Sequence, residues 1–106
     1  MNRSTLFGRL GKDPEIKTLP SGATICTFSV ADDWRYQKGE EWIDRVQWVS
    51  VAIFGKRGEA AARALQKGQA VALFGRFEIS QWKDKNGNPR ETLTFQVESW
   101  QAGAVK

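Results

Sequence analysis

The chain has 106 residues, which is enough for one compact core, so we expect a single domain over residues 1–106. Its 16 Lys and Arg outnumber its 12 Asp and Glu, and the net charge of +4 favours a polyanion as the partner. One cysteine and no histidine exclude an internal disulfide and a cysteine-based zinc site, and they remove the commonest general base. We expect a cytoplasmic protein, because the sequence has no apolar run of membrane-spanning length and no signal-peptide pattern.

Strand-like segments separated by turn residues predict five β-strands and one helix. The strands are expected over 3–10, 23–34, 42–54, 69–82 and 91–100, and residues 15–19 can continue the first one after a bend at 11–14. Turn residues at 20–22, 37–40 and 86–87 separate the strands. Strong helix formers at 59–65 predict the helix, which is expected to begin after Gly58 and to be capped at Gly68.

Three strands, then a helix, then two strands is the order of elements in the OB-fold. We therefore predict an all-β fold, a five-stranded Greek-key barrel with one short helix between its third and fourth strands. Gly8 and Gly75 lie inside strands, where the tight bends of a small barrel favour glycine. Cys26 lies in an apolar stretch and is expected to be buried and inert.

The alternation of side chains along a strand predicts an aromatic surface outside the barrel. The stripes expected to face the core are Val49, Val51 and Ile53 in the third strand and Val71, Leu73, Phe77 and Ile79 in the fourth. Trp48 and Phe54 are then left on the outer face of the third strand, with Ser50 and Ala52 between them. Arg76 and Trp82 are left on the outer face of the fourth strand. An exposed aromatic cluster indicates a binding site, and the alternative is that these rings cover a second small core or a subunit contact.

The remaining tryptophans lie at strand ends. Trp34 shares the parity of Phe28 and Val30, which are expected to face inward, but its place at the end of its strand leaves its direction open. Trp42 and Trp100 have no basic neighbour in the sequence, so we interpret them as packing residues.

Basic residues are interleaved with the aromatic ones. The candidates for contacts with a phosphate backbone are Arg35, Lys56, Lys67, Arg76 and Lys83. Flat rings beside cations are what an unpaired nucleic-acid strand requires, because every base has a π-face and every nucleotide a phosphate. For any one of these cations, a solvated surface charge is an equally good interpretation.

No catalytic arrangement is visible in the sequence. Asp32 and Asp33 are adjacent, as are Glu40 and Glu41, and adjacent residues of a strand point to opposite faces. The Gly55-Lys56 pair lacks the rest of a phosphate-binding P-loop. We therefore expect a binding protein rather than an enzyme, with no cofactor and no metal.

Several stretches, in the same order and at matching spacing, resemble the bacterial single-stranded DNA-binding protein family. They are residues 8–15, 20–22, 47–48, 53–56, 65–68 and 74–76. The resemblance covers about residues 2–97. It implies an OB-fold that binds single-stranded DNA without sequence preference during replication, recombination and repair, usually as a homotetramer, with a dimer as the alternative.

The resemblance also implies roles for individual residues. The stacking positions of the family match Trp34, Trp48, Phe54 and Trp82, which makes Trp34 a binding residue, and Lys56 and Lys67 match basic positions. Such a protein would be cytoplasmic and associated with the nucleoid.

The chain departs from the family pattern at three places. It stops at Lys106 without the usual acidic tip, so recruitment of replication proteins through a tail is not expected. Val49 stands where a histidine often lies at a subunit contact, and Glu78 stands where basic residues are common. A second hypothesis is therefore an OB-fold protein-interaction or primosome-type adaptor, for which DNA binding is secondary.

Overall fold

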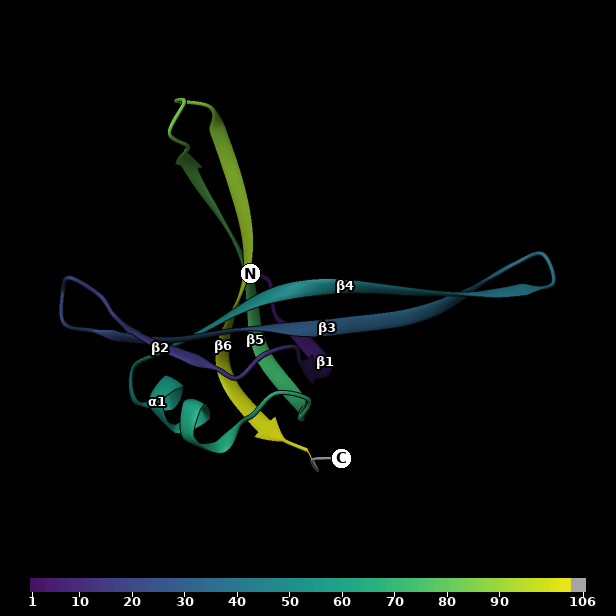
Figure 1. The fold of residues 1–106 in the computed structure, drawn as a ribbon, viewed down its shortest axis with the longest axis horizontal. Helices are drawn as coiled ribbons and strands as arrows, with labels where there is room; N and C mark the ends of the chain where they lie inside the picture. The colour runs from purple at the N-terminus through teal and green to yellow at the C-terminus, as the bar shows by residue number, and fades with distance from the viewer. Residues whose placement is uncertain (104–106) are drawn as a thin grey trace.

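The computed structural model describes residues 1–103, which form a β-barrel from which two long hairpins project (Figure 1). The elements are β1 (Ser4–Leu10), β2 (Glu15–Thr18), β3 (Thr24–Lys38), β4 (Glu41–Phe54), α1 (Gly55–Ala64), β5 (Ala70–Lys83) and β6 (Pro89–Ala102). The predicted all-β fold with one short helix is confirmed. Within residues 1–103, no helix is long and apolar enough to cross a membrane.

The barrel closes because the bent first strand pairs on both of its sides. The order of strands is β1-β5-β6-β4-β3-β2, and β1 also pairs with β3 through Arg9–Ala31 and Leu10–Val30. The bend at 11–14 divides the predicted first strand, and β2 continues along β3 from the Glu15–Thr27 pair. β1 and β2 together therefore serve as one strand of a five-stranded barrel.

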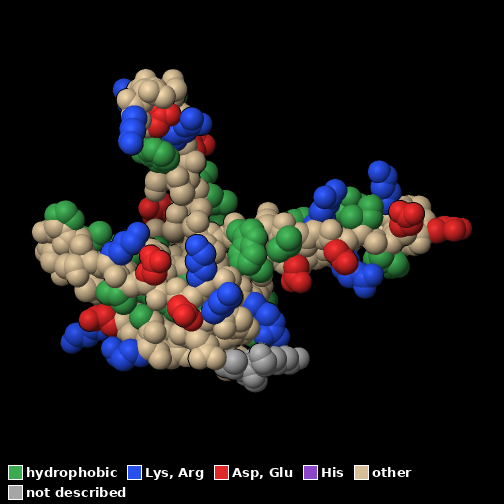
Figure 2. Space-filling view, viewed as in Figure 1, with side chains coloured by type: hydrophobic (Ala, Val, Ile, Leu, Met, Phe, Trp, Pro, Cys, Tyr) green, Lys and Arg blue, Asp and Glu red, His purple; other side chains and the backbone are tan. Residues whose placement is uncertain are grey.

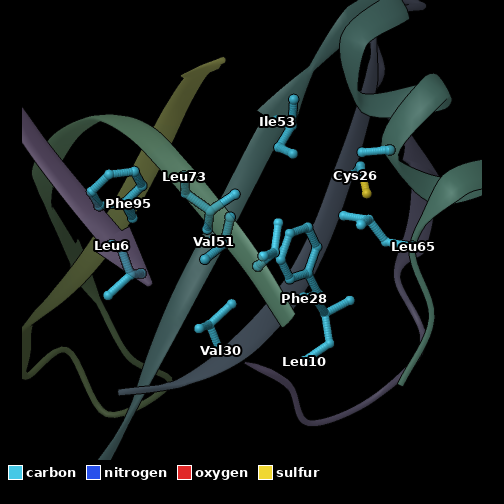
Figure 3. Packing of buried hydrophobic residues seen from close by; sticks show 12 residues of the cluster. Leu6, Leu10, Cys26, Phe28, Val30, Val51, Ile53, Leu65, Leu73 and Phe95 are labelled. Atoms are coloured by element: carbon cyan, nitrogen blue, oxygen red, sulfur yellow. The ribbon is translucent and has the colours of Figure 1, made fainter. Parts of the chain in front are cut away.

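The core follows the alternation of side chains inside the barrel. Figure 3 shows Leu6, Val30, Val51, Leu73 and Phe95 packed against one another between the strands. The rings of Phe77 and Phe95 meet edge to face at 4.9 Å between centroids. Cys26 is fully buried, as predicted, and its burial raises the pKa of the thiol. A neutral buried thiol is a poor nucleophile, in agreement with the expected inert role.

Two side chains lie differently from the predicted stripes. Ile79 was expected to face the core but is 62% exposed, because the strand has left the barrel at that point and pairs only with Leu93 of β6. Ala52 was expected on the outer face and is buried, because its small side chain lies between its strand partners Thr27 and Gln96.

The helix is placed differently from its prediction. It begins at Gly55, directly after β4, and ends at Ala64, with Leu65 as its C-terminal cap. Gly58 is buried inside the helix, where a Cβ would collide with the carbonyl oxygen of Ile53. Gly68 does not cap the helix: its N–H donates to the carbonyl of Leu10 at 2.8 Å and its positive φ turns the chain toward β5.

The two hairpins carry the strands beyond the barrel. We call the outer part of the β3–β4 hairpin, residues 33–47, the long arm, and the outer part of the β5–β6 hairpin, residues 79–93, the short arm. Figure 1 shows them leaving the barrel in different directions. Their turns lie where the sequence predicts them, at Gly39 with a φ of 64° and at Gly87 with a φ of 78°. The arms consist mostly of exposed residues.

Candidate nucleic-acid interface

The register of the strands places three of the predicted stacking residues on one continuous face. Paired residues of neighbouring strands share a face. Ser50 of β4 pairs with Thr94 of β6, and Thr94 pairs with Glu78 of β5. Counting in steps of two from these residues reaches Trp48 and Phe54 on β4 and Arg76 and Trp82 on β5. We call this outer surface the platform face.

The rings on the platform face are exposed, and the two indole rings are each held at one edge. Trp48, Phe54 and Trp82 are 60%, 50% and 50% exposed. The Trp48 ring lies so close to Gly11 that a Cβ there would collide with it. The indole N–H of Trp82 donates to the Thr92 hydroxyl at 2.9 Å. Such contacts limit the rotation of the rings and leave much of their surface free to accept another flat group.

Small polar side chains separate the rings. A hollow of about 460 Å³ lies over Ser50 and Ala52, the two residues of this face that separate Trp48 from Phe54 on β4. Hydroxyl and amide groups line it, from Thr27, Ser29, Ser50, Thr94 and Gln96. Lys12 and Lys17 stand at its border, beside Asp13 and Glu15. The hollow therefore offers donors, acceptors and charged groups of both signs on the stretch of β4 between two aromatic rings.

Trp34 does not share this face. It pairs with Arg45, and its side of the long arm also carries Tyr36, over whose ring the Arg45 guanidinium lies 5.8 Å from the centroid. Trp34 is nearly half exposed. Its direction, which the sequence left open, is thus outward but on the side opposite to Trp48.

The predicted cations fall into two groups. Arg35 and Arg76 lie on the platform face, and both have acidic partners. Arg35 pairs with Asp44 at 3.0 Å, and Arg76 pairs with Glu78 at 3.4 Å and Glu98 at 3.9 Å. These pairs are well exposed, so each contributes little to stability and exchanges readily with another anion.

The lysines are exposed and less closely grouped. Lys56 lies in the first turn of α1, next but one to Phe54. Lys67 lies in the loop after the helix, and its backbone N–H donates to the Asp13 carboxylate at 2.8 Å. Lys83 ends β5 and by parity points away from Trp82.

Two arginines beside the rings were missed from the sequence. Arg90 pairs with Trp82 on the platform face, and its Nε donates to the Asp84 carboxylate at 3.1 Å. Arg57 borders the same hollow as Phe54 and Arg76 and donates to the carbonyl of Glu98. Folding the sequence about the predicted turn at Asn86-Gly87 brings Arg90 near Trp82, so that signal was available. Arg57 could not be found in this way, because the sequence placed the start of the helix after Gly58, whereas the helix begins at Gly55.

The two tryptophans interpreted as packing residues have different outcomes. Trp100 is partly buried against the core, as predicted. Trp42 is 59% exposed near the end of the long arm, so its assignment to packing was wrong. The physical reason is that the arm extends past the barrel and has no core to offer within the described residues. The described residues also contain no group of three or more Cys, Asp or Glu that could hold a metal ion.

Comparison with known proteins adds independent evidence. Residues 1–102 match the model of the single-strand binding protein family. The chain is 36% identical over 92 residues to proteins named single-stranded DNA-binding protein from Neisseria meningitidis serogroups A and B, covering 85% of this chain and 52% of theirs. It is 35% identical over 102 residues to the protein of the same name from Borreliella burgdorferi, covering 95% of this chain and 68% of that one. The chain thus spans about half the length of the Neisseria relatives. On the strength of the family match, its order of strands and these identities, the chain belongs to the single-strand binding protein family.

Proposed function

We propose that this chain binds single-stranded DNA without sequence preference, by stacking bases on exposed rings while arginines and lysines hold the phosphates. The observation that carries the proposal is the single outer face on which Trp48, Phe54 and Trp82 are each exposed by half or more. Base–aromatic stacking tolerates any base, which accounts for the lack of sequence preference. The names of the relatives agree with this role.

The strand of DNA takes a defined course in this proposal. Bases stack on Trp48 and Phe54, and the nucleotides between them cross the hollow lined by hydroxyl groups. Arg76 and Lys56 lie beside Phe54 and hold phosphates there. Trp82 extends the path along the short arm, and Lys83 holds a phosphate where the DNA passes to the other side of that arm. Lys67 lies beyond the Asp13 border of the hollow.

Trp34 imposes a condition on that course. Because it lies on the opposite side of the long arm from Trp48, one strand reaches both rings only by passing around the edge of the arm. Arg35 and Arg45 point to opposite sides of the arm and hold phosphates before and after this turn. The proposed mode of binding is therefore wrapping rather than a straight groove.

We include assembly and cellular role in the proposal. Within residues 1–103, Ser4–Gly8 of β1 pair on one side only, with β5, which leaves an edge that a second copy can extend. A homotetramer, with a dimer as the alternative, accommodates wrapping around several arms. Protection of single strands in replication, recombination and repair follows, in the cytoplasm with the nucleoid, without catalysis and without a cofactor.

The adaptor hypothesis has its own supporting observation. Ile79 and Leu93 form an exposed apolar pair on the side of the short arm away from Trp82. Such a pair suits a protein contact better than a phosphate backbone. Ile79→Ser with Leu93→Ser lowers the mass in solution if the pair joins copies of this chain, and it leaves both the mass and the DNA affinity unchanged if the pair contacts a different protein.

A titration with oligo(dT) over a series of salt concentrations tests the proposed function. Each phosphate contact on a single strand lowers the affinity with a slope of about −0.7 in a log–log plot against salt. We expect a clearly negative slope and much weaker binding to duplex DNA of the same length. Absence of binding at low salt, or a flat response to salt, would contradict the proposal.

A further inference from the structure

The outer side of β4 carries three aromatic rings at equal spacing. Trp42, Trp48 and Phe54 follow one another at intervals of six residues, and an even interval keeps side chains on one face of a strand. At about 3.3–3.4 Å per residue, each interval is about 20 Å. Each of the three rings is exposed by half or more. Trp42 therefore continues the platform face at the spacing already set by the other two rings.

A positive charge accompanies Trp42. The guanidinium carbon of Arg35 lies 5.5 Å from the centre of the Trp42 ring. Arg35 is held there by Asp44, its partner across the strands, at 3.0 Å. This ion pair is exposed, so replacing the carboxylate by a phosphate oxygen costs little. A ring and a releasable arginine side by side supply one contact to a base and one to its phosphate.

The surroundings of Trp42 favour DNA over a protein partner. Between Trp42 and Trp48 the platform face carries the exposed Val46 and Asp44, the partner of Arg35, and the Trp42 ring continues an interface already proposed for bases. Beyond Trp42 come the exposed Glu40 and Glu41 at the tip of the arm. Figure 2 shows Lys and Arg side chains interspersed with acidic ones along the long arm, and acidic side chains at its outermost end. At the turn the carboxylates of Glu40 and Glu41 outnumber the ammonium of Lys38, so phosphates are disfavoured past Trp42.

We propose that Trp42 is a further base-stacking residue of this protein, with Arg35 as its phosphate partner, and that it marks the outer end of the DNA path on the long arm. The inference rests on the proposed function. With Trp42 included, the stacking surface on β4 has three rings separated by two intervals, instead of two rings separated by one. At 3.4 Å per stacked nucleotide, the span from Phe54 to Trp42 takes about 12 nucleotides, or fewer if the strand is extended.

The test uses three variants at one position, Trp42→Ala, Trp42→Leu and Trp42→Phe. They are titrated with an oligo(dT) of about 12 nucleotides and with one of about six, which spans a single interval. With the longer oligonucleotide we expect Trp42→Ala and Trp42→Leu to lose affinity by about 5- to 30-fold, and Trp42→Phe to stay close to the wild type. With the shorter one, all variants should bind like the wild type, because the Trp48 and Phe54 interval suffices.

Other outcomes overturn the inference in distinguishable ways. Equal affinity of all variants for the longer oligonucleotide shows that Trp42 makes no stacking contact, while the proposed function stands. Recovery of affinity by Trp42→Leu, with a lower mass of Trp42→Ala in sedimentation, identifies the ring as an apolar contact between copies. Failure of the wild type to bind either oligonucleotide removes the proposed function itself.

Discussion

Trp48 is the side chain on which the stacking proposal depends most directly. It lies on the platform face with its ring 60% exposed, opposite the core stripe of β4. If it stacks on a base, Trp48→Ala costs about 1–3 kcal/mol of binding free energy, or about 5- to 150-fold in affinity. The free energy of unfolding should change little, because the buried residues of β4 are untouched. Titration with oligo(dT) and a thermal melt of the same variant measure both quantities.

Trp100 is the matched control for that substitution. It is also a tryptophan on a strand, but it packs against the core. Trp100→Ala should lower the melting temperature and leave the affinity for oligo(dT) within about twofold, because it removes packing rather than a platform ring. If Trp48→Ala instead melts early and binds normally, Trp48 is a packing residue and the platform face has been assigned to the wrong side.

Glu78 should weaken DNA binding at the platform face. Its carboxylate lies 3.4 Å from Arg76, where it competes with phosphate. Glu78→Gln should therefore raise the affinity for oligo(dT), by up to about fivefold at low salt because an exposed pair contributes at most about 1 kcal/mol. The gain should shrink as salt rises, because screening weakens both interactions.

Glu91→Gln makes the same change of charge on the same hairpin. Glu91 pairs with Gln81 and by parity lies on the side of the short arm opposite to Trp82. It should affect affinity much less than Glu78→Gln does. Equal gains from the two variants would mean that only the net charge matters and that Arg76 has no special place in the path.

At the residue scale, prediction from the sequence succeeded where a strand has a core on one side. Trp48 was placed correctly because Val51 and Ile53 define the inner side of the same strand. Trp42 was wrongly assigned to packing because it has no basic residue next to it in the sequence. Its cation, Arg35, comes from the other strand of the hairpin, and only the register of the pair brings them together.

The loop of the short arm is ordered by one carboxylate, which makes it sensitive to acid. Asp84 accepts hydrogen bonds from the N–H groups of Asn86 and Asn88, both at 2.9 Å, and from Arg90 at 3.1 Å. The bond from the Asn88 N–H, with those from Arg90 and Asn86, holds the pKa of Asp84 below its ordinary value. A lowered pKa stabilises the folded loop above the unfolded value near 4, and this contribution is lost as pH falls through the lowered pKa.

NMR spectra of the loop amides measure this dependence. We expect the shifts of Asn86 and Asn88 to stay constant from neutral pH to about pH 4 and to change together below it. In Asp84→Asn this acid transition should be absent. A transition in the wild type near pH 6 would contradict the assignment to Asp84.

At the scale of elements, turns were easier to predict from the sequence than the ends of the helix. Gly39 and Gly87 have positive φ, which glycine adopts more readily than other residues, so the residue type alone indicates these turns. The start of α1 depends on a contact far along the chain, where Gly58 packs against Ile53 and Cys26. Likewise the apolar Ile79 reads as a core residue, because an alternating pattern does not reveal where a strand leaves the barrel.

The whole molecule is expected to assemble with copies of itself. The unpaired side of Ser4–Gly8 and the exposed Phe7 on β1 provide an edge and an apolar contact. Sedimentation at micromolar concentration should give the mass of a tetramer, or else of a dimer, with and without oligo(dT). A monomer in both conditions would contradict assembly and would confine the DNA path to one barrel and its two arms.

The order of strands around the barrel could be predicted from the sequence, whereas the reach of the arms could not. Three strands, a helix and two strands lead to one barrel, because the core stripes of the strands must meet. Long strands such as β3 and β4 satisfy the same pattern whether they end at the barrel or continue past it. That Trp34 in the long arm and Trp48 at the base of the arm lie on opposite sides of the hairpin therefore emerged only from the structure.

The arms combine many exposed rings with few buried contacts, and this has a consequence for local unfolding. Segments that bury little apolar surface open at a lower free energy than the core they are attached to. Backbone amides of the strand residues from Trp34 to Lys38 and from Glu41 to Val46 should thus exchange with deuterium faster than those of Val51 or Leu73, although all of them lie in strands. A bound DNA strand would slow exchange most in the arms, because it would add contacts where the free protein has few. The arms would then open at a free energy closer to that of the barrel core.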